Sequence, residues 1–176
     1  EFDQIKMIVD PERIHREYET FLREGDAYID RRFTDLRDWD FPVYCAVNIT
    51  ITTKDGRAVP FILNAIQLRL VETVLEELAL LKAVRILIDK IRQGGVWTVI
   101  LIFFYWLTSL RPNRNALIIT QDVESVENFS ARVRAAMEEA RAALTPSIKS
   151  ERRNLIHFAN PTPRGGARHE RKGKGQ

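Results

Sequence analysis

The sequence has few of the residues that build disulfides and metal centres. Its 176 residues include one cysteine, Cys45, so no disulfide can form within the chain and no site made only of cysteines can hold a metal. The histidines His15, His157 and His169 lie far apart and lack the spacing of zinc ligands. A lone cysteine is compatible with a reducing compartment, and we therefore expect a cytoplasmic setting.

The sequence also offers no convincing membrane span. The apolar stretch from Val96 to Leu107 is about a dozen residues long, whereas a spanning helix needs about twenty. We interpret this stretch as a buried helix, with a membrane segment as the less favoured alternative. No secretory signal opens the chain, and residue 1 is Glu1 rather than Met, so we expect a fragment or a processed chain.

Acidic residues are scarce at the C-terminal end. The net charge of the whole chain is +3, and the segment from Pro161 to Gln176 alone carries +4, with Glu170 as its one acid. The preceding residues therefore carry about −1. A Gly- and Arg-rich end of this kind predicts a basic disordered tail over 161–176, solvated in the simplest interpretation and a contact for nucleic-acid phosphates in the alternative.

The N-terminal third predicts a helical appendage with a β-hairpin, over residues 1–57. Apolar residues at helical spacing indicate a helix from Pro11 to Arg23, with Ile14, Tyr18, Phe21 and Leu22 on one side. Alternation indicates a strand from Tyr44 to Thr53, with Val47, Ile49 and Ile51 on one face. The Asp55-Gly56 pair predicts a turn, and a return strand follows it from Ala58 to Phe61.

From Asn64 the pattern changes to alternating helices and short apolar runs. This alternation is typical of an α/β fold with a parallel sheet flanked by helices, here a partial three-layer core over 58–160. The expected elements are a helix over 65–81, a strand over 84–88, a loop over 90–95, a helix from 96, a strand over 116–120, a helix over 123–144 and a strand over 154–158. The expected apolar faces are Ile66, Leu70, Val74, Leu78 and Leu81 in the first of these helices, and Val126, Phe129, Val133, Met137 and Leu144 in the last.

The loop over 90–95 joins a predicted strand to a predicted helix, the place where phosphate-binding loops lie. Free N–H groups and the helix dipole stabilise an anion there. Gly94 and Gly95 allow close approach of the backbone, and Lys90 and Arg92 add positive charge. The standard lysine after the second glycine is absent, since Val96 occupies that position. A tight connection with two solvated cations is the alternative interpretation.

Several short motifs share an order and spacing with a known family. The loop reads Lys90-x-Arg92-Gln93-x-Gly95-x-Trp97-Thr98. Before it, the segment 59–67 contains a Pro-Phe pair and ends in Gln67. After it come two further similar stretches, 116–128 and 155–161. Together these motifs resemble the N-terminal part of the ATPase domain in large terminase subunits of tailed bacteriophages. The resemblance covers residues 45–161, and it implies a P-loop ATPase that packages DNA into procapsids.

The resemblance also implies roles for individual residues. Gln67 corresponds to a glutamine that reads the adenine ring, and Lys90 corresponds to the phosphate-sensing lysine at the front of the loop. The hydroxyl that binds magnesium would fall at Trp97, so Thr98 becomes its substitute. The expected cofactors are ATP and Mg²⁺, and the expected binding residues are Gln67, Lys90, Arg92, Gln93, Gly94, Gly95, Trp97 and Thr98.

The acids that complete such an ATPase are not apparent in the sequence. After Asn160 the one acid is Glu170, without the hydrophobic strand that precedes a Walker B pair. We therefore expect the parent protein, and not the isolated chain, to hydrolyse ATP. The implied partners are double-stranded DNA, a portal protein, a small terminase subunit and further copies in a ring, in the cytoplasm of an infected bacterium and without a membrane.

Two other classes fit parts of the pattern. A helicase-like or other P-loop ATPase would share Gln67 and the loop. A non-enzymatic α/β interaction domain would use the loop as a plain turn, in keeping with Trp97 and the missing acids. Nucleotide binding separates these classes, because a plain turn has no reason to hold ATP.

Overall fold

The structure is a computed structural model of the whole chain, and helices dominate it. It describes residues 2–53, 55–80, 84, 86, 88, 95–111, 114–119, 123–141, 144, 146, 148–152 and 155–158. Four helices come first: α1 (Phe2–Ile8), α2 (Pro11–Glu24), α3 (Asp26–Asp38) and α4 (Phe41–Asn48). A hairpin, longer helices and a second hairpin follow: β1 (Thr50–Thr52), β2 (Ala58–Pro60), α5 (Ala65–Ala79), α6 (Val96–Ser109), α7 (Val123–Glu139), β3 (Ile148–Arg152) and β4 (Leu155–Phe158).

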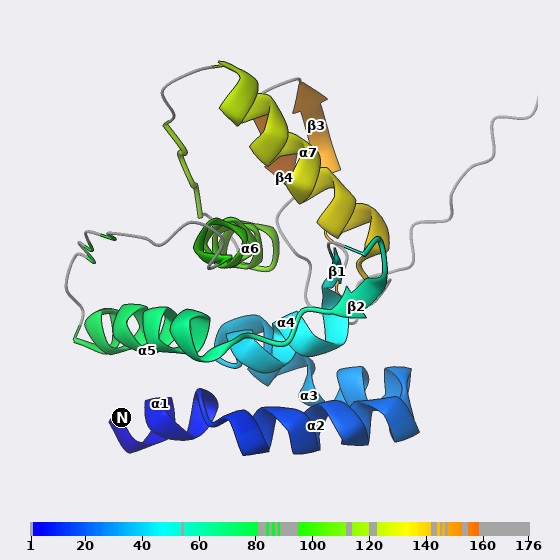
Figure 1. Cartoon of the computed structure of the whole chain (residues 1–176), viewed down its shortest axis with the longest axis vertical. Helices are drawn as coiled ribbons and strands as arrows, with labels where there is room; N and C mark the ends of the chain where they lie inside the picture. The colour runs from blue at the N-terminus through cyan, green and yellow to red at the C-terminus, as the bar shows by residue number, and fades with distance from the viewer. Residues whose placement is uncertain are drawn as a thin grey trace, which may run out of the picture.

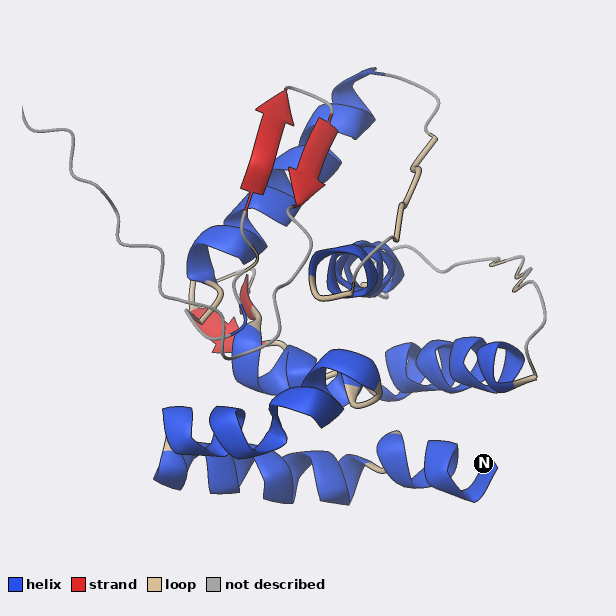
Figure 2. Cartoon of the chain, turned by 180° about the vertical axis from the view of Figure 1, so that it is seen from behind, coloured by secondary structure: helices blue, strands red, loops and turns tan. Residues whose placement is uncertain are grey.

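Figure 1 shows how these elements are stacked. α1 and α2 form one side of the molecule, with α4 and α5 above them, and α6 lies between α5 and α7. The β3–β4 hairpin lies beside α7 on the opposite side of α6 from α1 and α2, as the reverse view in Figure 2 also shows. α6 therefore occupies the middle of the fold.

The prediction of a buried helix after residue 95 is confirmed. α6 buries residues around much of its circumference, as expected for a helix that is apolar on nearly all sides. Trp106 anchors it: its indole Nε1 donates to the Leu36 carbonyl of α3 at 2.7 Å. The Phe41 ring of α4 lies 5.0 Å from the Phe103 ring and 5.2 Å from the Trp106 ring, which joins α4 and α6 in one aromatic cluster.

The helix over 11–23 and the hairpin at 55–56 are also confirmed. Asp10 caps α2 by accepting from the Glu12 and Arg13 amides, and Pro11 stands in the first turn. β1 and β2 are antiparallel, with Thr50 opposite Pro60. Gly56 has a φ of +76°, a conformation that costs glycine little and other residues more.

The strand expected from Tyr44 to Thr53 is wrong in its first half. Residues 44–48 belong to α4, and the strand begins at Thr50. Pro42 lies in the first turn of α4, and the Tyr44 amide donates to the Asp40 carbonyl at 2.9 Å. Every residue of α4 is buried. Its sequence therefore lacks the alternation of apolar and polar positions that would indicate a helix.

The buried face of α5 is rotated from the expected one, and the face of α2 departs from the expected one at a single residue. Ile66 and Leu78 of α5 are exposed, and Gln67, Leu68 and Val71 are buried instead. On α2, Ile14 and Phe21 are buried as expected, whereas Leu22 is exposed. In α5 the polar Gln67 faces inward, where it completes the capping box and contacts Gly95. α7 ends at Glu139, and Leu144 is buried beyond its end.

Two antiparallel hairpins are the β-structure of the described residues. β3 pairs with β4, so the strand expected at 154–158 exists but its partner is antiparallel. Residues 84, 86 and 88 and residues 116–119 carry no strand pairing. The remaining positions of both expected strands lie outside the described residues, and the parallel three-layer core stays a prediction. The core cluster includes residues on both sides of position 57, and the predicted division there also stays a prediction.

A buried carboxylate joins the first four helices. Asp40, 3% exposed, accepts from both Nη atoms of Arg13 at 2.8 and 2.7 Å and from Arg32 Nη2 at 3.0 Å. Arg32 Nη1 donates to Glu17 at 2.9 Å, and the Tyr28 hydroxyl donates to the other Glu17 oxygen at 2.6 Å. Arg13 also reaches the carbonyls that end α1. The network therefore fixes α1, α2, α3 and the start of α4 against one another.

The buried carboxylate gives a first prediction. Asp40→Asn leaves Arg13 and Arg32 partly buried without their shared counter-charge, and we expect a loss of about 3 kcal/mol in the free energy of unfolding, measured by urea denaturation. Asp55→Asn is the matched control, because its ion pair with Arg57 is exposed and is worth at most about 1 kcal/mol. Equal losses in the two variants would contradict this role of Asp40.

The network also predicts a pH dependence. Burial raises the pKa of the Glu17 carboxyl, but the Tyr28 hydrogen bond and the Arg32 charge outweigh burial and leave this pKa below its usual value. Such a group contributes stability above the pKa of the unfolded chain, about 4.3, and loses it as the pH falls through the folded-state pKa. Unfolding free energies measured from neutral pH downwards should therefore fall less steeply below about pH 4.3 in Glu17→Gln.

The control for this measurement is Glu12→Gln. The Glu12 carboxylate is exposed and lies 4.0 Å from Arg16. This variant should keep the steepness of the wild-type protein. A Glu17→Gln curve parallel to that of the wild-type protein would exclude Glu17 as a source of acid sensitivity.

Candidate functional site

The candidate site begins at the first turn of α5. Asn64 is the N-cap, and its Oδ1 accepts from the Gln67 amide at 3.1 Å. Gln67 Oε1 accepts in return from the Asn64 amide at 2.9 Å. This reciprocal pair is a capping box, and it satisfies two N–H groups that a helix start leaves open. It also fixes the direction in which the Gln67 carboxamide points.

The first turn of α6 forms the other half of the site. Gly95 is its N-cap, in the left-handed conformation with φ +65°, and the Val99 amide donates to the Gly95 carbonyl at 3.3 Å. The amides of Val96, Trp97 and Thr98 occupy the first three helical positions, where no intrahelical acceptor is available. Together with the helix dipole, they make this end of α6 favourable for an anion.

One hydrogen bond joins the two helix starts. Gln67 Nε2 donates to the Gly95 carbonyl at 3.1 Å, across 28 positions of sequence. A Cβ on residue 95 would lie 2.6 Å from that nitrogen, closer than real Cβ contacts come. Glycine is therefore required at 95 for two reasons, the left-handed backbone and the neighbouring carboxamide. Two segments that the resemblance to terminases would place at one nucleotide site are thus in direct contact.

Gln67 is also a structural residue in this conformation. Its side chain is 4% exposed, and both its oxygen and its nitrogen form hydrogen bonds within the protein. A carboxamide offers two acceptor and two donor places, so one of each remains. Reading an adenine edge therefore requires the Gln67 side chain to become accessible.

Trp97 and Thr98 follow Gly95 in the first turn of α6. Trp97 is 42% exposed, and its ring lies 5.5 Å from the Phe129 ring of α7. Thr98 is exposed. The position that the resemblance assigns to a magnesium-binding hydroxyl is therefore an indole packed against α7, and the threonine hydroxyl lies one residue further along the helix.

The remaining predicted site residues, Lys90, Arg92, Gln93 and Gly94, lie outside the described residues. The structure brings together Gln67 and Gly95, with Trp97 and Thr98 in the turn that follows Gly95. No group of three His, Cys, Asp or Glu side chains that could hold a metal ion occurs among the residues that the structure describes. Cys45 is no nucleophile candidate, because burial raises the pKa of its thiol well above the usual range.

The sequence interpretation missed Asn64 and Phe129 as neighbours of the site. Asn64 was detectable, since Asn-x-x-Gln before an apolar run is a capping-box pattern. Phe129 was recognised as an apolar position of its helix, but its contact with Trp97 depends on how α6 and α7 cross. No local pattern encodes that crossing.

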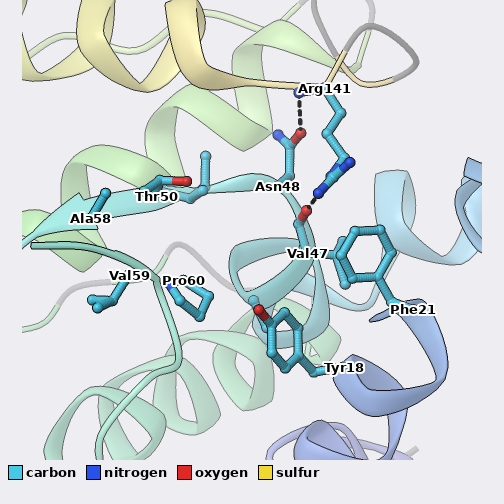
Figure 3. A pocket seen from close by; sticks show the side chains of 11 residues that line it. Tyr18, Phe21, Val47, Asn48, Thr50, Ala58, Val59, Pro60 and Arg141 are labelled. Carbon is cyan, nitrogen blue, oxygen red and sulfur yellow. Dashed lines mark hydrogen bonds between the residues drawn. The ribbon is translucent and has the colours of Figure 1, made fainter. Parts of the chain in front are cut away.

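A pocket of about 360 Å³ lies elsewhere, between α2, the end of α4, the first hairpin and Arg141, two residues beyond α7 (Figure 3). Arg141 spans one side of it. Its amide donates to Asn48 Oδ1 at 2.9 Å, and its Nε donates to the Val47 carbonyl at 3.0 Å. Its guanidinium lies 4.4 Å from the centre of the Phe21 ring. Arg141 therefore joins the end of α7 to α2 and α4, which gives the pocket wall a structural role.

Neither a scan against protein-family models nor searches of curated proteins and of solved structures found a match to this chain. Among the described helices, none is both long and apolar enough to cross a bilayer.

The contact at Gly95 gives a prediction for stability. Gly95→Ala forces a side chain into a left-handed backbone, at a cost of about 1 kcal/mol. It also displaces Gln67, which should add about 1 to 2 kcal/mol by breaking buried hydrogen bonds. Gly56→Ala is the matched control, because its φ is also positive and no atom lies within 4 Å of the added Cβ.

Urea denaturation of four variants separates these two costs. Gly95→Ala in a Gln67→Ala background should cost about as much as Gly56→Ala, since the clash is gone. If Gly95→Ala were no more destabilising than Gly56→Ala in the wild-type background, the Gln67–Gly95 contact would have no energetic weight.

Proposed function

We propose that this chain is part of an ATP-driven DNA-packaging motor of the tailed-phage terminase type. The parent protein moves double-stranded DNA into procapsids as a ring of subunits, and this chain supplies its nucleotide-binding turns. The observation that carries the proposal is the hydrogen bond from Gln67 to Gly95. It supports one site made of a predicted adenine-binding segment and a predicted phosphate-binding segment.

The chemistry of the α6 start supports ATP as the ligand. Its open amides and dipole favour phosphate oxygens, and Gly95 keeps side-chain atoms away from them. Lys90 and Arg92, which precede this turn in sequence, would add charge-assisted hydrogen bonds to the β- and γ-phosphates. Mg²⁺ supplies further charge neutralisation, and Thr98 is the hydroxyl of this turn that could contribute to its binding.

We propose that the acidic residues needed for ATP hydrolysis belong to other parts of the parent motor. We propose that this chain binds nucleotide and that turnover requires the complete protein. The portal protein and the small terminase subunit are the partners that this assignment implies, in the cytoplasm of the infected host.

A non-enzymatic interaction domain is the second candidate. The observation in its favour is the double use of the Gln67 carboxamide inside the protein, which suffices to explain why a glutamine stands there. A helicase-like translocase would use the same nucleotide-binding turns, and its DNA substrate would distinguish it from a packaging motor.

Titration calorimetry with MgATP tests the nucleotide site. One lost charge-assisted contact is worth roughly 1.5 to 3 kcal/mol, so Lys90→Ala should weaken affinity about ten- to a hundredfold. Gly95→Val should abolish binding. Arg57→Ala, which removes an exposed cation of the β1–β2 hairpin, should bind as the wild-type chain does. The proposal would be contradicted if the wild-type chain did not bind MgATP. It would also be contradicted if Lys90→Ala and Gly95→Val both bound MgATP with the affinity of the wild-type chain.

Trp97→Ser tests the metal assignment in the parent protein. If position 97 faces magnesium, the restored hydroxyl should leave ATP turnover intact or raise it. Turnover that falls in Trp97→Ser, with unchanged MgATP affinity, would instead assign the indole a positive role.

A further inference from the structure

A second cationic surface lies at the opposite end of α6 from the nucleotide site. Arg111 follows that end, and its Nε donates to the Arg37 carbonyl at 3.3 Å. Its Nη2 donates to the Asp38 carbonyl. A helix of 14 residues is about 21 Å long, which separates this surface from Gly95. Its properties are therefore independent of the proposed nucleotide site.

Arg111 has no direct carboxylate partner among the residues that the structure describes. Its guanidinium lies 4.3 Å from the centre of the Trp106 ring and donates hydrogen bonds to two backbone carbonyls. The nearby Asp38 carboxylate is held by Arg37 through two hydrogen bonds of 2.8 and 2.6 Å. Burial, with the charges of Arg114 and Arg37, outweighs Asp38 and lowers the pKa of Arg111. Positive charge at this surface thus exceeds negative charge.

An aromatic side chain stands beside these cations. Trp39 directly follows Asp38, and its side chain is 67% exposed. Its amide donates to the Asp35 carbonyl at 2.9 Å, which ends α3 next to the carbonyls that Arg111 contacts. Asp35, a further acid of the last turns of α3, is paired with Arg32 at 2.9 Å. An exposed indole therefore occurs at one corner of the fold with the half-buried guanidinium groups of Arg37 and Arg111 and the exposed Arg114.

We propose that this corner, made of Trp39, Arg37, Arg111 and Arg114, binds single-stranded nucleic acid. Guanidinium groups match phosphate oxygens with paired donors, and an exposed indole offers a face on which an unpaired base can stack. An acidic peptide could use the arginines, but its carboxylates would leave the indole face without a partner. A duplex would offer phosphates, but its bases are already stacked on one another.

Fluorescence anisotropy with a labelled oligothymidylate tests the proposal on the full chain. Trp39→Ala should weaken binding about 5- to 100-fold, and Trp39→Phe should restore part of that loss, because stacking is sequence-tolerant and needs an aromatic face. Arg114→Gln, which changes an exposed residue, should reduce the slope of log K against log salt by about 0.7. The basic tail is present in every variant, so its contribution cancels.

Arg57→Gln is the charge-matched control. It removes one exposed cation from the β1–β2 hairpin and should alter affinity by no more than about twofold. Equal affinity of wild-type protein and Trp39→Ala would overturn the proposal, whether or not the chain binds DNA by its tail. Binding of polyglutamate that depends on the same arginines but not on Trp39 would overturn it in favour of a peptide surface. Preference for duplex over single strand, unchanged in Trp39→Ala, would also overturn it.

Discussion

The fold depends first on the Asp40 carboxylate. It precedes α4 at the N-cap, yet it caps no amide and instead accepts hydrogen bonds from Arg13 and Arg32. A carboxylate this deeply buried is tolerated because its charge is matched twice over. The two guanidiniums come from α2 and α3, so the start of α4 is fixed by both helices. After α4, the Phe61 amide donates to the Ile49 carbonyl at 2.8 Å. This hydrogen bond attaches the segment that leads into the candidate site to the end of α4.

Polar contacts also fix the two ends of α6. Its first turn is held by Gln67, and its last turns are held by the Trp106 hydrogen bond to α3 and by Arg111. Each end is thus attached to a different part of the helical assembly through a polar contact, while apolar burial fills the space between. A ligand that displaces Gln67 would disturb the start of α5 as well, because the same side chain completes its capping box. The proposed nucleotide site and the orientation of α5 are therefore physically linked.

Local signals in the sequence predicted several individual elements, and long-range contacts account for part of what was missed. The helical spacing of apolar residues over 11–23, the turn at Gly56 and the apolar composition of α6 act within a few residues, and each led to the right element. α4 was missed because a helix buried on all sides has no polar face to mark its period. Gln67 was assigned to the site by resemblance alone, whereas its contact with Gly95 spans 28 positions. The contacts of Arg111 with α3 span more than seventy positions, beyond any local pattern.

The central claim is that nucleotide binds where the starts of α5 and α6 meet. Amide hydrogen exchange of the full chain, measured with and without MgATP, tests it most directly, because exchange reports local protection segment by segment. The account predicts that MgATP slows exchange in the peptide that contains Gly95 to Val99 and changes exchange around Asn64 to Leu68, while the peptide containing Trp39 is unaffected. MgATP binding that leaves both helix starts unchanged, or that protects other segments instead, would contradict the account.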